Sequence, residues 1–169
     1  QGADPRVSAR DIEALFAQAD EQVAGIPGTP IHRSPAWFVV DDGKKTLEPL
    51  NQHGNELRAL ISYVIADRFF IEDISQRLLA IGKTAAGFFS TPMGEAMLYI
   101  SETDRDRTAV LIDVGYLNTE VIAVEGDAII FHKVLPLGGG HIAADLAYGL
   151  EVPLDQAEQV KRGYEFGLG

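Results

Sequence analysis

The residues best suited to chemistry lie between Val110 and Arg162. An apolar strand, Val110–Asp113, ends on a carboxylate and turns at Gly115, and Thr119 follows six residues after the aspartate. A glycine triplet, Gly138-Gly139-Gly140, stands at the start of a predicted helix, where anions often bind. A carboxylate, glycines that allow close backbone approach and a hydroxyl could together hold a phosphate group. This stretch is therefore a candidate phosphate site.

Apolar patterning predicts the elements that position these residues. Two strands, Thr119–Glu125 and Ala128–Leu135, are hinged on Glu125-Gly126-Asp127 and should form an antiparallel meander with the first strand. A helix is expected from about Gly140 to Gly149. A second helix should follow, with Pro153 at its first position.

The N-terminal half predicts an α+β unit. A helix is expected from about Ala9 to Ala24, capped by Ser8 and Asp11 and followed by a loop over 25–30. Strands are expected over Ala36–Val40 and Leu57–Ala66. The second has apolar residues at both odd and even positions, so we expect it to be buried on both faces.

Further elements follow the second strand. Asp67 should cap a helix over 68–81 that Gly82 closes, a short strand is expected over Ala86–Ser90, and a helix over Pro92–Ile100. The aromatic pairs Trp37-Phe38 and Phe69-Phe70 are expected to lie in the core.

Composition excludes several classes of function. The 169 residues are 46% hydrophobic, which is enough to build a core, and the net charge of −11 argues against binding nucleic acid or an anionic membrane surface. Without cysteine, disulfides and thiolate metal sites are excluded. No apolar run reaches the ~18 residues of a membrane span. A start without Met and an end at Gly169 lead us to expect a piece of a longer protein.

No catalytic or metal site is expected. The four histidines (His32, His53, His132 and His141) lack ligand spacing, and His141 is expected at the surface or as a cap. No nucleophile–base set can be assigned.

The order of motifs in the last third resembles FtsA, the bacterial actin homologue of cell division. The shared pattern is D-x-G-x-x-x-T, a hairpin, V-x-P-x-G-G, I-x-x-D-[IL]-A and a Pro-started helix with AE-x-x-K. The matching residues are Asp113, Gly115, Thr119, Val134, Pro136, Gly138, Gly139, Ile142, Asp145, Leu146, Ala147, Pro153, Ala157, Glu158 and Lys161.

The N-terminal half is more loosely similar to the SHS2 (1C) subdomain of that family. The resemblance implies a fold of the α+β / α/β class: an SHS2-type subdomain followed by part of an actin-like (ribonuclease H-like) ATPase subdomain. We expect the SHS2-like subdomain with flanking helices over residues 1–100, a polar connector over 101–107, and the first half of subdomain 2A over 108–169.

The resemblance also implies the chemistry of the loop. In this superfamily the glycine N–H groups approach the phosphates, the Asp binds the magnesium shell through water, and the Thr hydroxyl adds a donor. The family's DIGGGTTD is DVGYLNTE here, so Tyr116 and Leu117 stand where glycines are usual. If those positions need φ > 0, each costs about 1–2 kcal/mol. The loop is either a phosphate hairpin or a simple β-turn that only preserves the fold.

The candidate cofactor-binding residues are therefore Asp113, Gly115, Thr119, Gly138 and Gly139. For the glycine triplet we favour a close strand-to-helix packing turn over an anion site. ATP and magnesium are possible ligands of the complete protein, whereas no cofactor, metal or catalytic activity is expected for this chain alone.

The function implied is a cell-division scaffold that assembles at the membrane and links division proteins. Expected partners are other division proteins and further copies of itself. FtsZ and the membrane would be bound through regions outside this sequence. The complete protein is expected in the cytoplasm, peripheral to the inner face of the cell membrane. Two alternatives stay open: a PilM-like pilus assembly ATPase, and an active actin-like ATPase or phosphotransferase.

Overall fold

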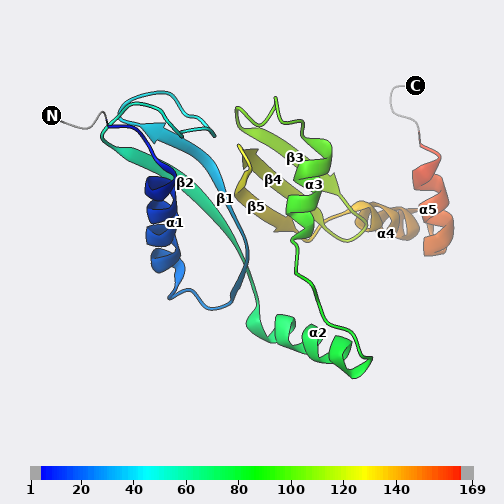
Figure 1. Cartoon of the computed structure of the whole chain (residues 1–169). Coiled ribbons are helices and arrows are strands. Elements are labelled where there is room, and N and C mark those ends of the chain that lie inside the picture. Colours follow the sequence, from blue (N-terminus) through cyan, green and yellow to red (C-terminus); the bar gives the residue numbers. More distant parts are fainter. Residues whose placement is uncertain (1–4, 165–169) are drawn as a thin grey trace. The chain divides into compact units, whose positions relative to one another are not determined.

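The computed structural model describes residues 5–164 and has mixed α and β structure (Figure 1). It divides into two compact units. The first contains the chain up to Ala109 together with Ala123–Ile130, and the second contains Val110–Ile122 and the chain from Phe131 onward. The division into an SHS2-type and an actin-like subdomain stays a prediction.

The first unit begins with helix α1, Ala9–Val23. The predicted capping box is confirmed: Ser8 Oγ accepts a hydrogen bond from Asp11 N–H, and the Asp11 carboxylate accepts from Ser8 N–H at 2.8 Å. Strands β1 (Thr29–Val40) and β2 (Leu57–Ala66) follow and pair antiparallel in a two-stranded sheet. β1 is longer than predicted because pairing with β2 extends it through Pro30 and Pro35, next to irregularities in the register.

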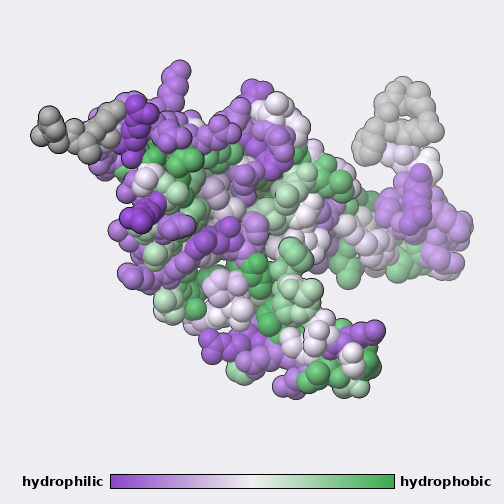
Figure 2. All heavy atoms as spheres, viewed as in Figure 1, coloured by the Kyte–Doolittle hydropathy of each residue, from purple (hydrophilic) through white to green (hydrophobic). Residues whose placement is uncertain are grey.

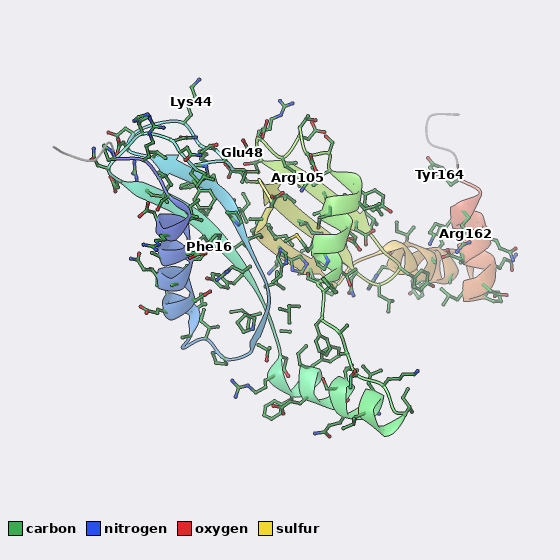
Figure 3. The ribbon with its side chains drawn as sticks, in the orientation of Figure 1. Phe16, Lys44, Glu48, Arg105, Arg162 and Tyr164 are labelled. Atoms are coloured by element: carbon green, nitrogen blue, oxygen red, sulfur yellow. The ribbon has the colours of Figure 1, made fainter. Side chains whose placement is uncertain are left out.

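Among the two strands of the first sheet and α1, the buried side chains come from β1. Buried side chains on β1 recur at every second residue, the alternation of a half-buried strand. Phe38 is 3% exposed, and its ring packs edge-to-face with that of Phe16 from α1, with 6.2 Å between the ring centroids. Phe16 is labelled on α1 in Figure 3. Trp37, predicted to be in the core, is only partly buried.

β2 does not have the burial expected of it. None of its residues 57–66, all of which the structure describes, is buried. The prediction was wrong because the sheet has only two strands among the described residues, so β2 is an edge strand and not a central one.

Helix α2, Arg68–Ala80, begins where predicted and ends one residue earlier, but it lacks the predicted environment. Asp67 Oδ1 accepts from Phe70 N–H at 2.9 Å, and Gly82 ends the helix at φ +70°. Phe69 and Phe70 are 79% and 60% exposed, so their placement in the core was wrong. Hydrophobic surface is visible over α2 in Figure 2.

The segment after α2 also differs from the prediction. Residues 86–90 form no strand, because no described strand pairs with them, and Phe89 is 89% exposed. Helix α3, Thr91–Tyr99, is confirmed and buries Met93 and Ala96.

The remaining elements confirm the predicted meander and helix pair. Strands β3 (Ala109–Val114), β4 (Thr119–Glu125) and β5 (Ala128–Leu135) lie in that order in one sheet, joined by short turns. Helix α4 spans Gly139–Leu150 and α5 spans Leu154–Arg162. Pro153 is the N-cap of α5 rather than its first residue, because its ψ of 152° is extended.

The turn between β4 and β5 is bound within the first unit. Gly126, at φ +59°, donates its N–H to the Arg105 carbonyl at 2.7 Å. Asp127 N–H donates to the Pro35 carbonyl, and the Arg105 guanidinium donates to Asp127 Oδ1 at 2.9 Å. Lys45 pairs with Glu125. Strand β1, the 44–46 loop and the connector thus all hold this turn.

Across residues 5–164, no helix combines the length and the apolar character needed to cross a bilayer. Within the same residues, no three His, Asp or Glu side chains come together as a set of metal ligands.

Candidate functional site

The second unit brings the two glycine segments of the candidate site together. The turn of the β3–β4 hairpin is closed by Gly115 N–H donating to the Asn118 carbonyl at 2.9 Å. The start of α4 lies against this turn: Gly139 N–H donates to the Gly115 carbonyl at 2.9 Å, and Gly140 N–H donates to the Tyr116 carbonyl at 2.7 Å. The amides that open α4 therefore bind carbonyl groups of the same chain.

The glycine triplet is needed for this contact. A β-carbon on Gly138 would lie 2.6 Å from the Tyr116 carbonyl oxygen, and one on Gly140 would lie 2.7 Å from the Tyr116 ring. Neither approach is sterically allowed. The interpretation of the triplet as a close strand-to-helix packing turn is thus supported by the geometry.

The neighbouring polar groups are also bound internally. Gly138 N–H donates to Nδ1 of His141 at 3.1 Å, which makes His141 a cap of α4. The Thr119 hydroxyl donates to the Leu137 carbonyl at 2.7 Å and joins the start of β4 to the segment before α4.

Tyr116 and Leu117 are not strained in this loop. Left-handed backbone at non-glycine positions is confined, among residues 5–164, to Asp41, Asn51 and Glu151. The expectation of a penalty at positions 116 and 117 was wrong, because the turn adopts ordinary dihedral angles. The side chains of Tyr116 and Leu117 are 49% and 62% exposed.

Lys161, on α5, completes the arrangement. Its ammonium donates to the Gly139 carbonyl at 2.9 Å and to Glu158 at 2.6 Å, and lies 5.4 Å from the centre of the Tyr116 ring. Hydrogen bonds from Lys161 and then from Arg162 lower the pKa of Glu158. Arg162 lies at the C-terminal end of α5 (Figure 3) and donates to Glu158 at 2.8 Å.

The five predicted site residues fall into two groups, those bonded within the chain and the exposed Asp113. Four of them, Gly115, Thr119, Gly138 and Gly139, come together, but the amide or hydroxyl of each donates to an acceptor within the chain. Asp113 is exposed on β3, and within residues 5–164 its carboxylate has no hydrogen bond or ion pair. In this arrangement the four donors are already engaged within the chain, while the Asp113 carboxylate is exposed.

Lys161 matches the family pattern in the sequence but is not among the predicted site residues. Its contact with Tyr116 links residues 45 positions apart, which no local pattern indicates. Two features of the sequence could have suggested this contact. An aromatic residue stands where the family has a glycine, and a lysine that matches the family pattern lies on a helix that follows.

Comparisons with known proteins agree with this architecture. The family model of the cell division protein FtsA matches residues 110–167, which include the hairpin, the glycine triplet and both helices. FtsA of Helicobacter pylori is 25% identical over 134 residues, covering 79% of this chain and 27% of the relative. FtsA of Pseudomonas aeruginosa is 25% identical over 167 residues, covering 98% and 40%.

A solved structure supports the fold over nearly the whole chain. A chain of the PilM–PilN type IV pilus biogenesis complex matches with a TM-score of 0.51 and 19% identity, covering 95% of this chain and 45% of that one. Its likeness concerns the fold alone.

The fold and the hairpin together define a protein of the actin-like ATPase fold class. Within that class the chain is similar to the cell division protein FtsA. It spans 27% to 40% of the length of these two curated relatives.

Proposed function

We propose that this chain forms part of an FtsA-like scaffold of cell division, which assembles at the inner face of the membrane and links division proteins. The observation that carries the proposal is the FtsA match over residues 110–167, together with relatives that are all named cell division protein FtsA. In the complete protein we expect contacts with further copies of itself and, through other regions, with FtsZ and the membrane.

The geometry of the hairpin supports a scaffold over an ATPase or phosphotransferase. Phosphoryl transfer needs backbone donors directed at the phosphates and a bound magnesium ion. Here the amides of Gly138, Gly139 and Gly140 and the hydroxyl of Thr119 are engaged within the chain. A scaffold does not need those donors to be free.

The test uses the complete protein encoded by its gene. A fluorescent fusion should localise to the division site, and the purified protein should sediment with FtsZ polymers, with ATP turnover close to background. Loss of division-site localisation together with binding to the cytoplasmic tail of a pilus membrane protein would replace this proposal with the PilM-like alternative. Sustained ATP turnover that Asp113→Ala abolishes would replace it with the enzyme.

A further inference from the structure

The hairpin turn, α4 and α5 meet at a single point. Three segments contribute to it: residues 115–119, residues 137–141, and the Glu158–Lys161 turn of α5. We call this meeting point the closed loop. The first two segments are in direct hydrogen-bonded contact.

We propose that the closed loop is a self-sufficient latch in which Lys161 and Tyr116 hold the hairpin on α4, so that no nucleotide is needed to order this region. Carbonyls of Gly115 and Tyr116 take the place of the phosphate oxygens that a helix N-terminus attracts. The inference rests on the geometry alone and does not depend on the role in division.

Lys161 is the positioning residue of this latch. A helix N-terminus carries a partial positive charge, which a lysine alone would not balance, so the paired Glu158 carboxylate matters here. Here Lys161 binds the Gly139 carbonyl on the first turn of α4 and is held there by Glu158, whose side chain is 18% exposed. The ammonium over the Tyr116 ring adds a cation–π contact that a glycine at 116 could not provide.

The replacement of glycine by Tyr116 therefore has a structural role. The Tyr116 carbonyl accepts from Gly140, its ring lies against the position a Gly140 β-carbon would occupy, and its face receives Lys161. These three contacts use one residue to join the hairpin to both helices.

The experiment measures amide hydrogen exchange in the complete protein, on peptides covering 115–119 and 138–142, with and without millimolar Mg-ATP. We expect the 138–142 amides to be protected without nucleotide, and Mg-ATP to change neither their exchange nor the melting temperature. Lys161→Met should speed exchange in 138–142 about tenfold, the effect of losing one charge-assisted hydrogen bond. Lys161→Arg, which keeps the charge, should recover much of the protection.

Lys133→Met is the matched control, since Lys133 is an exposed lysine of the same unit with no described partner. Equal exchange in the Lys161→Met and Lys133→Met variants would overturn the role of Lys161. Protection of 115–119 by Mg-ATP, abolished by Asp113→Ala, would overturn the latch itself. Either result would leave the division role to be judged separately by localisation.

Discussion

The backbone of Gly138 lies so close to Tyr116 that a β-carbon on Gly138 would sit 2.7 Å from the Tyr116 carbonyl carbon. Rigid backbone cannot move aside as a flexible side chain can. We therefore expect Gly138→Ala to destabilise the protein by about 1–3 kcal/mol, the usual cost of overpacking. Urea unfolding would measure it.

Gly149 provides the control for this substitution within the same helix. Nothing lies within 4 Å of the β-carbon that alanine would add there. Gly149→Ala should stabilise the protein by about 0.5–1 kcal/mol, because alanine favours a helix interior. Similar effects of the two substitutions would show that the hairpin does not rest on α4 as described.

The buried guanidinium of Arg105 is paired with the Asp127 carboxylate. Arg105 is only 9% exposed, and its Nε has no hydrogen-bond partner among the described residues. The 2.9 Å hydrogen bond from Nη1 to Asp127 therefore supplies much of the hydrogen bonding of this guanidinium. We expect Asp127→Ala to lower the free energy of unfolding by about 1–3 kcal/mol, because it leaves a buried N–H donor without an acceptor. Asp127→Asn keeps an acceptor oxygen and should cost less. If the Asn variant is as unstable as the Ala variant, the hydrogen bond between Arg105 and Asp127 does not account for the loss of stability.

Asp41 should make stability depend on pH at acidic values. Its carboxylate accepts backbone N–H bonds from Glu56 and Asn55, which lower its pKa. A carboxyl with a lowered folded-state pKa adds stability above its unfolded pKa, near 3.8, and this stability is lost as pH falls through the folded value.

Asp41→Asn would test this dependence without disturbing the backbone. Asp41 has φ 50°, and asparagine tolerates that left-handed conformation. The variant should show a flatter stability curve below about pH 4 than the wild type. Asp42→Asn is the neighbouring control, since Asp42 is fully exposed with one ion pair to Arg58. A curve unchanged by Asp41→Asn would contradict the prediction.

Tyr63 and Arg33 both donate to Asp20, and so join α1 to the two strands. Tyr63 Oη lies 2.7 Å and Arg33 Nη1 2.6 Å from the Asp20 oxygens. Tyr63→Phe should cost about 0.5–1.5 kcal/mol, the net value of one hydrogen bond, measured by thermal unfolding. Tyr148→Phe is the control, because Tyr148 is 90% exposed. An equal loss in both variants would count against the α1 contact.

The features that the sequence predicted well depend on a few neighbouring residues. The Ser8–Asp11 capping box, the Asp67 cap, the Gly82 stop and the Gly126 turn all formed where expected. Each needs only local hydrogen bonds or one permissive dihedral angle, so adjacent residue types specify it.

The features that failed depend on which segments meet. The apolar run of β2 could not show that the strand would lie at an edge, and Phe69-Phe70 could not show that α2 would leave them exposed. In the candidate site, the sequence identified the glycines. It could not show that their N–H groups donate to the carbonyls of Gly115 and Tyr116. Donors look the same in a sequence whether a phosphate or a carbonyl accepts from them.

Strands β4 and β5 cross from one compact unit into the other, since Ala123–Ile130 groups with the N-terminal part of the chain. A cut at the connector would therefore remove the partners of Arg105 and Pro35 along with the rest of the sheet. A single residue inserted into either strand would reverse the faces of the side chains beyond it. We expect the length of this hairpin to tolerate change only when both strands lengthen together.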